Sequence, residues 1–262
     1  MMGLLAVGLC VLVVLAVRRV VRPKKLTLAT SPGRPNSLSL AHILALFILY
    51  LATGSAAEIL TGTEWRLLAW AASQLIWLAA CLVLASMTFR LGLRRGLGLS
   101  TRHWVYDGFR AIVACLAVLP VCVALLVLTV YLFFWILPPE QAADWVQDHK
   151  LLEVLPALHG AWVVLPVLVA VVLAPLAEEV FFRGMVQSML RRYTGRPWPA
   201  IVITSLFFAM MHLGTRQAVP SLFVLGVVLG YNYERSGRLY SPILIHALFN
   251  GVFVALRLSG SP

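Results

Sequence analysis

Residues 163–184 read VVLPVLVAVVLAPLAEEVFFRG. From Val163 to Ala177 the segment is apolar apart from two prolines, and a run of this kind is typical of a membrane-spanning helix. Two carboxylates, Glu178 and Glu179, and the cation Arg183 then follow at what would be membrane depth. Each ionisable group there costs roughly 2.5–3.5 kcal/mol on insertion scales, so these three side chains need a specific reason to be present.

The composition of the whole chain agrees with a membrane protein. Of its 262 residues, 61% are hydrophobic and only 12% are charged, whereas roughly a quarter of the residues are charged in soluble domains. A soluble enzyme and a disordered protein are therefore excluded. Apolar runs of about 20 residues predict an all-α polytopic fold with about eight transmembrane helices. These runs lie near residues 3–21, 38–57, 67–89, 109–137, 155–182, 198–213, 219–233 and 242–258.

The formal net charge of +11 is explained by topology, without nucleic acid as a partner. One set of alternate loops holds 16 cations, namely Arg18, Arg19, Arg22, Lys24, Lys25, Arg34, Arg90, Arg94, Arg95, Arg102, Arg110, Arg191, Arg192, Arg196, Arg235 and Arg238. The other set holds four, namely Arg66, Lys150, Arg216 and Arg257. Because cytoplasmic loops carry the excess of Lys and Arg, both termini are expected outside.

The polar residues inside the predicted spans divide the chain into two parts. Residues 1–150 contain about four apolar helices with few polar intrusions, whereas residues 151–262 contain about four helices with most of the unusual polar side chains. We expect both parts to form one integral membrane domain, with the functional site in the second. The three aspartates, Asp107, Asp144 and Asp148, are expected in loops, which argues against an aspartyl dyad in the membrane.

Glu178 stands out from its charged neighbours. Glu179 and Arg183 are four residues apart, so on a helix they can pair and offset part of their burial cost. Glu178 points about 100° away and lacks this partner. A poorly solvated carboxylate binds a proton more readily, which suits Glu178 to act as a general base.

His212 is expected to face Glu178. Gly195 lies within the polar turn Arg191–Pro197, 17 residues after Glu178 and 17 before His212. In an antiparallel helical hairpin with this turn at its tip, the two side chains come out at the same depth. We interpret His212 as a catalytic partner of Glu178 in preference to a packing residue.

His246 and Asn250 form a third cluster. Ser241 and Pro242 predict a helix start, with Ser241 as N-cap, and His246 and Asn250 then share one face. Both could stabilise an oxyanion; alternatively, His246 could bind a metal with Glu178 and His212, or the pair could be an interhelical clamp. Gly226 and Gly230 form a G-x-x-x-G that indicates close helix packing.

The three motifs together resemble the CPBP family of intramembrane endopeptidases, which includes the CAAX prenyl proteases. The matching residues are Glu178, Glu179 and Arg183; Phe208 and His212; and His246 and Asn250. The resemblance covers roughly residues 160–257. It implies an eight-helix fold with a conical intramembrane cavity that opens to the cytoplasm.

The resemblance also implies roles for these residues. Glu178 and His212 would activate a water, His246 and Asn250 would stabilise the oxyanion, and Glu179, Arg183 and Phe208 would support them. Zinc held by Glu178, His212 and His246 stays an alternative, and no cofactor is assigned. The expected substrate is a membrane-anchored or lipidated protein, or a sorting tail. The expected location is the bacterial inner membrane, with the site facing the cytoplasm.

A different class of function stays open. A transporter, or a non-proteolytic scaffold or immunity factor, could be built on the same fold with the same motifs. The need for Glu178 discriminates between the classes, because a peptidase should lose turnover by orders of magnitude without it.

Overall fold

The computed structural model describes residues 2–21, 28, 34–60, 62–100, 103–147, 155 and 158–259. Within these ranges the chain is helical, and the β-structure found there is one isolated bridge between Asn36 and Phe89. The all-α class is therefore confirmed.

The helical elements follow one another along the chain with short connections. They are α1 (Met2–Val21), α2 (Leu40–Glu58), α3 (Thr63–Thr88), α4 (Gly92–Gly96), α5 (Trp104–Ile136), α6 (Pro139–Trp145), η3 (Gly160–Val163), α8 (Val164–Leu168), η4 (Val169–Leu173), α9 (Ala174–Glu179), η5 (Val180–Gln187), α10 (Ser188–Thr194), α11 (Pro197–Met210), η6 (Leu213–Ala218), α12 (Val219–Ser236) and α13 (Tyr240–Leu258). The segments from α8 to α10 join end to end into one rod.

Six helical stretches in the described part of the chain are long and apolar enough to cross a membrane. They are Leu40–Glu58, Thr63–Thr88, Trp104–Ile136, Val164–Thr194, Leu213–Ser236 and Tyr240–Leu258. Six of the eight expected spans overlap them. The span expected at 198–213 is instead the shorter helix α11, which ends at Met210. The span expected at 3–21 coincides with α1, a helix of 20 residues that is not among the six.

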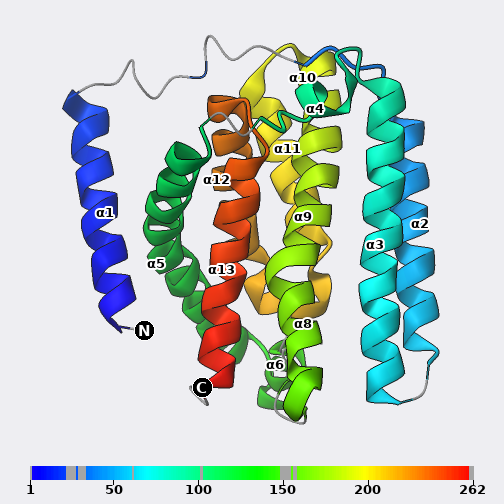
Figure 1. Ribbon diagram of the computed structural model, residues 1–262. Coiled ribbons are helices and arrows are strands. Elements are labelled where there is room, and N and C mark those ends of the chain that lie inside the picture. The colour runs from blue at the N-terminus through cyan, green and yellow to red at the C-terminus, as the bar shows by residue number, and fades with distance from the viewer. Residues whose placement is uncertain are drawn as a thin grey trace.

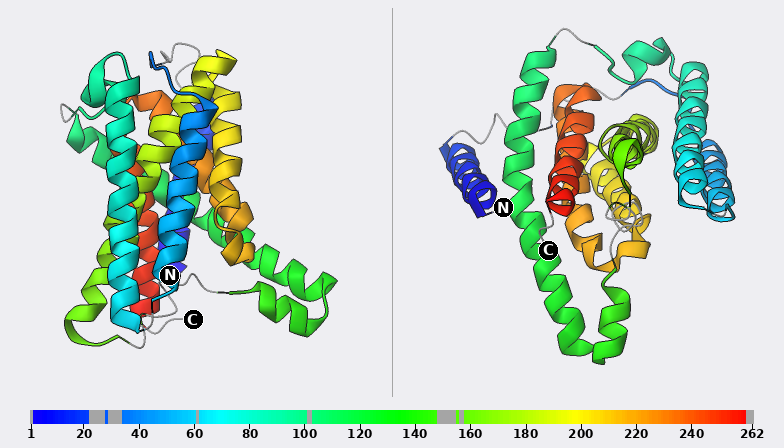
Figure 2. Two further views of the ribbon diagram at one scale, coloured as in Figure 1. Left: turned by 90° about the vertical axis from the view of Figure 1, so that its right-hand side faces the viewer. Right: turned by 60° about the horizontal axis from the view of Figure 1, so that its bottom comes forward.

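The helices lie roughly antiparallel in one bundle (Figures 1 and 2). The α2–α3 pair flanks the rod α8–α10 on one side, and α13 and α5 lie on the other. One end of the bundle holds α4, the α10–α11 turn and the α12–α13 turn. The opposite end holds the start of α1, the end of α13 and α6, and we call it the terminus end.

The rod from Val164 to Thr194 contains two π-helical segments, η4 and η5. Pro175 explains part of this irregularity, because a proline inside a helix has no N–H to donate and its ring clashes with the preceding turn. Wider π turns are often found at functional sites. In this rod, η4 ends at Leu173, two residues before Pro175, and η5 begins directly after the two glutamates.

The G-x-x-x-G of α12 provides close helix packing, as its sequence predicts. A Cβ added at Gly226 would lie 3.0 Å from Ser205 Cβ on α11, and one added at Gly230 would lie 2.7 Å from Gln187 Oε1 on η5. The small side chains also expose two backbone carbonyls, since Arg183 Nη2 donates to Gly226 O and Gln187 Nε2 donates to Gly230 O. The rod and α12 are thus joined by buried hydrogen bonds.

Two local predictions were wrong. Asp107 is not in a loop: it lies buried in the first turn of α5 and accepts hydrogen bonds from Arg238 Nε and Nη2, both at 2.6 Å. An acidic residue is favourable in the first turn of a helix, so α5 begins before its apolar run. Asp144 lies in α6, and Asp148 lies outside the described residues.

The start of α13 also differs from the prediction. Leu239, and not Ser241, is the N-cap, and Ser241 is buried within the first turn. Pro242 is tolerated there because first-turn N–H groups have no partner within the helix.

Replacing Gly226 with leucine should destabilise the protein by about 1–3 kcal/mol, because the new side chain collides with Ser205 across a packed helix pair. Thermal unfolding in detergent would show a lower melting temperature than that of the matched variant Gly54→Leu. Gly54 also lies within a helix, but a Cβ there meets nothing within 4 Å. Equal melting temperatures for the two variants would contradict close packing at Gly226.

Candidate active site

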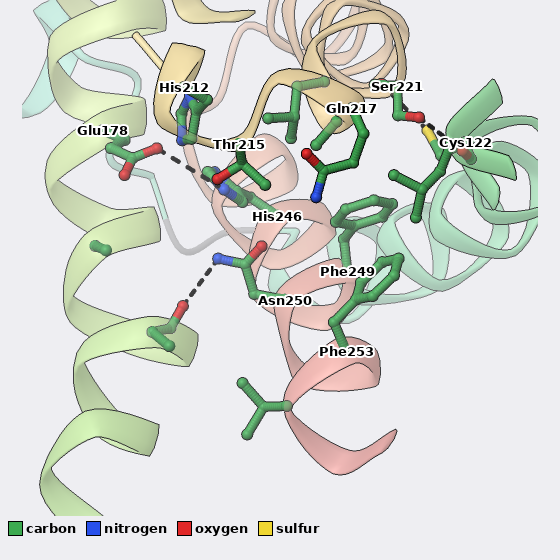
Figure 3. Close-up of a pocket in the computed structure, with 16 residues that line it drawn as sticks. Cys122, Glu178, His212, Thr215, Gln217, Ser221, His246, Phe249, Asn250 and Phe253 are labelled. Carbon is green, nitrogen blue, oxygen red and sulfur yellow. Dashed lines mark hydrogen bonds and ion pairs between the residues drawn. The ribbon is translucent and has the colours of Figure 1, made fainter. Parts of the chain in front are cut away.

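A cavity of about 230 Å³ lies between the rod, η6, α12, α13 and α5 (Figure 3). Its walls are largely apolar, and Glu178, His212, His246 and Asn250 all line it. The structure therefore brings together the four residues that the sequence singles out as catalytic. The remaining lining residues are Cys122, Leu126, Ala170, Ala174, Thr215, Gln217, Ala218, Ser221, Leu222, Phe249, Phe253 and Val254.

Glu178 is the carboxylate at the cavity wall. It lies near the end of α9, and its side chain is 16% exposed. Its Oε2 lies 3.9 Å from His246 Nε2, too far for a direct hydrogen bond. Among the described residues, Oε2 has no hydrogen-bond partner. Glu178 therefore remains available to a ligand in the cavity, as its position outside the Glu179–Arg183 pair predicts.

Glu179 points the other way and organises the buried side of the site. Its Oε1 accepts a hydrogen bond from Arg183 Nη1 at 2.7 Å and another from His246 Nδ1 at 2.9 Å. Glu179 and Arg183 are both fully buried, and charges so placed are tolerated only when they are paired and hydrogen-bonded. The predicted pair between Glu179 and Arg183 is thus present, and it includes His246 as well.

His212 directs one ring nitrogen towards its own helix. Its Nδ1 lies 2.9 Å from the carbonyl oxygen of Phe208. Because a carbonyl can only accept, Nδ1 must carry the proton, so Nε2 of the neutral ring has a free lone pair. His212 follows the last turn of α11 at Met210. The N-terminal end of η6 therefore presents a proton acceptor beside the cavity.

His246 is fixed by contacts on two sides. Its Nδ1 donates to Glu179, so its Nε2 is directed towards Glu178. Phe208 packs edge-on against the imidazole of His246, with ring centroids 5.6 Å apart, and also contacts the ring of His212 at 5.0 Å. The fully buried Phe208 thus spaces the two histidines, which gives a physical basis for the supporting role expected of it.

Asn250 is held by a backbone group that Pro175 leaves without a donor. In η4, Ala174 N–H donates to Val169 O, five residues back. The next donor in this register would be residue 175, which is a proline and has no N–H. Asn250 Nδ2 instead donates to Ala170 O at 2.9 Å (Figure 3). The amide has two N–H bonds, so one remains for a ligand.

In their described arrangement, the side chains of the cavity do not form a metal site. A zinc site needs at least three ligand atoms about 2 Å from one point. In the part of the chain that the structure describes, no three His, Cys, Asp or Glu side chains are grouped in this way. We therefore assign no chemical step to a metal.

The sequence did not reveal the polar residues that line the cavity across from Glu178. Two of them, Thr215 and Gln217, belong to η6. Gln217 is 6% exposed and donates from Nε2 to Gln147 O, while its Oε1 has no partner among the described residues. Ser221 and Cys122 join α12 to α5, since Ser221 Oγ donates to Cys122 O and Cys122 Sγ donates to Ser221 O. The one available signal in the sequence was the position of Gln217, a polar residue directly before an apolar span, which could have pointed to a buried polar side chain.

Glu179 Oε1, which accepts hydrogen bonds from both Arg183 and His246, leads to a prediction about the stability of the fold. Replacing either Glu179 or Arg183 with leucine should destabilise the protein by about 3–5 kcal/mol, because each change leaves an uncompensated buried charge. The double variant should be less destabilised than the sum of the two, as a double-mutant cycle of melting temperatures in detergent would show. Exposed Glu140→Leu serves as the control for loss of a carboxylate. Strict additivity would mean that the two charges do not stabilise each other.

Comparisons with known proteins place the resemblance in the part of the chain that carries the motifs. Residues 160–252 match the family described as Type II CAAX prenyl endopeptidase Rce1-like. An uncharacterized 24.3 kDa protein of Escherichia coli is 37% identical over 87 residues, which are 32% of this chain and 40% of that protein.

A second relative is the membrane-embedded CAAX protease MroQ of Staphylococcus aureus (strain USA300). It is 33% identical over 92 residues, which are 33% of this chain and 37% of that protein. The chain thus matches about two fifths of the length of each relative, and no solved structure matches it significantly. Over residues 160–252, these matches confirm the resemblance to the CPBP family that the three motifs indicate.

Proposed function

We propose that the protein is an intramembrane endopeptidase that hydrolyses a peptide bond with a water activated by Glu178 and His212. The observation that carries the proposal is the convergence of Glu178, His212, His246 and Asn250 on one cavity with mainly apolar walls. The matched family and the relative MroQ support a membrane protease of CAAX type. The proposed substrate is a membrane-anchored or lipidated protein, or a sorting tail.

Water activation needs a base that is not already neutralised. Glu178 is the carboxylate of the site that has no cationic partner within hydrogen-bond distance among the described residues, since Arg183 is held by Glu179. His212 offers the free Nε2 lone pair beside the same cavity. In the proposed reaction, a water between these two groups loses a proton to Glu178 as its oxygen attacks the scissile carbonyl, with His212 orienting it. The proton then passes to the leaving amine.

The oxyanion needs donors that already point at it. Asn250 retains one N–H after its bond to Ala170 O. His246 can donate from Nε2 when its ring is protonated, and its Nδ1 is held by Glu179 Oε1. Both donors are fixed by buried contacts before the substrate binds, which is the condition under which such donors are effective.

The proposed setting is a bilayer, with the protein in the bacterial inner membrane. Adding α1, and α11 as a helix that ends within the membrane, to the six long apolar stretches would give the eight-helix arrangement of the family. The apolar cavity walls, with Phe249, Phe253 and Leu126, suit a substrate that reaches the site through lipid. Water would reach the polar groups from one end of the cavity.

Removing the base tests the activity directly. Glu178→Ala and His212→Ala should each lower cleavage by about 10²–10⁴-fold, the usual contribution of an acid–base group. Mass spectrometry of the termini of membrane proteins would compare cells that carry each variant with cells that carry the unchanged chain. Glu140→Ala, an exposed change on α6, is the control. Identical termini in all strains would favour a scaffold, immunity factor or transporter.

A second test separates the chemistry of Asn250 from its packing. Asn250→Ala should lower turnover by about 10²–10³-fold through loss of an oxyanion donor, but it also leaves Ala170 O without a donor. In the double variant Pro175→Ala/Asn250→Ala, the new N–H of residue 175 can bond Ala170 O. The double variant should recover thermal stability without recovering turnover. If the double variant recovers turnover as well as thermal stability, Asn250 has a packing role and is not an oxyanion donor.

A further inference from the structure

The cavity extends from Glu178 and His246 in one direction only, towards the terminus end. Glu178 is its uppermost lining residue on the rod, and Ala174 and Ala170 continue downward from it. On α13 the lining runs from His246 to Val254, away from the start of that helix. The remaining lining residues come from η6, from the first turn of α12 and from the second half of α5, all on the same side.

The opposite direction is filled by packed side chains. Every residue from Val180 to Gln187 is buried, and Phe182, Arg183 and Phe208 pack together directly above the two histidines. A close-packed protein interior has no space for an extended peptide. A substrate cannot reach Glu178 from the end of the bundle that holds the α10–α11 turn without unfolding this cluster.

Most of the cations among the described residues lie at that closed end. Among the described residues, the end with the α10–α11 and α12–α13 turns holds Arg34, Arg90, Arg94, Arg95, Arg110, Arg191, Arg192, Arg196, Arg235 and Arg238. The terminus end holds Arg66, Arg216 and Arg257, together with acidic residues that include Glu140 and Asp144 on α6. Because Lys and Arg accumulate on the cytoplasmic side, the closed end belongs in the cytoplasm.

Two of the expectations from the sequence therefore exclude each other. Termini outside and a cavity open to the cytoplasm cannot both hold, because the cavity lies at the same end of the bundle as the start of α1 and the end of α13. The first expectation rests on the charges of this chain, and the second rests on the resemblance.

We infer that the active-site cavity opens on the non-cytoplasmic side of the membrane and that it takes a peptide segment exposed on that side. The opening side follows from the cavity and the charges alone, whereas the peptide substrate rests on the proposed function. A segment of an exported, membrane-attached protein fits both conditions. A lipidated tail that stays in the cytoplasm does not, because its scissile bond would lie at the closed end.

Accessibility of single cysteines tests the opening side without any need for activity. Three variants are compared in a chain in which Cys10, the exposed cysteine, and Cys122, which lines the cavity, are replaced by serine; Cys81 and Cys115 are buried. Glu140→Cys marks the terminus end, Arg196→Cys marks the arginine-rich end, and Thr215→Cys marks the cavity wall. Each is expressed in bacterial cells, and spheroplasts are treated with a sulfonated, membrane-impermeant maleimide before and after lysis.

The expected result is labelling of Glu140→Cys and Thr215→Cys in intact spheroplasts, with Arg196→Cys labelled only after lysis. Labelling of Arg196→Cys but not of Glu140→Cys in intact spheroplasts would overturn the orientation. Labelling of Thr215→Cys only after lysis, together with Glu140→Cys labelled before it, would overturn the opening side.

A fusion provides a second readout that needs no substitution in the chain. Alkaline phosphatase is active only outside the cytoplasm, so a phosphatase joined after Pro262 should be active, and an inactive fusion would overturn the orientation. A further outcome is that the labelling is as expected while the termini of membrane proteins are the same with Glu178→Ala as with the unchanged chain. In that case the cavity still opens on the non-cytoplasmic side, but the proposal of a peptide substrate is wrong.

Discussion

One carboxylate oxygen, Oε1 of Glu179, holds the candidate site together. It accepts hydrogen bonds from Arg183, one turn further along the rod, and from His246 on α13. Arg183 in turn donates to Gly226 O on α12. Three helices far apart in the sequence are thus joined by one buried cation and one buried anion, and neither charge is tolerable without the other. This bonding leaves Glu178, the adjacent glutamate, on the cavity side without a strong partner.

Much of this arrangement could be predicted from the sequence, because it follows from helical periodicity. The four-residue spacing gives the Glu179–Arg183 pair and the shared face of His246 and Asn250, and the turn at Gly195 brings His212 to the level of Glu178. The structure has these features, with Gly195 in the left-handed conformation that a tight turn requires. Residues brought together by tertiary packing alone could not be found in this way. Asp107 and Arg238 are 131 positions apart, and Gln217 depends on a carbonyl 70 positions away.

The direction of the cavity could not be predicted from the sequence for a related reason. Helix spacing fixes how deep a residue lies, but it does not show on which side of that level the packing is loose. That depends on how Phe182, Phe208 and Arg183 fill the space above the histidines. The bulky, fully buried residues of η5 make the rod dense towards the α10–α11 turn, whereas alanines at 170 and 174 leave room below. The same helix therefore forms both the closed end of the cavity and its open wall.

The bond between Asn250 and Ala170 O has a consequence for the transfer of this site to another scaffold. Copying the seven motif residues onto a regular α-helical bundle would give Ala170 O an ordinary backbone donor, and Asn250 would lose the group that orients it. The interruption at Pro175 is thus part of the recognition between two distant segments, although it carries no polar side chain. In related sequences that retain the asparagine, we expect a proline at the position of Pro175 as well. The asparagine donates the hydrogen bond that the proline cannot.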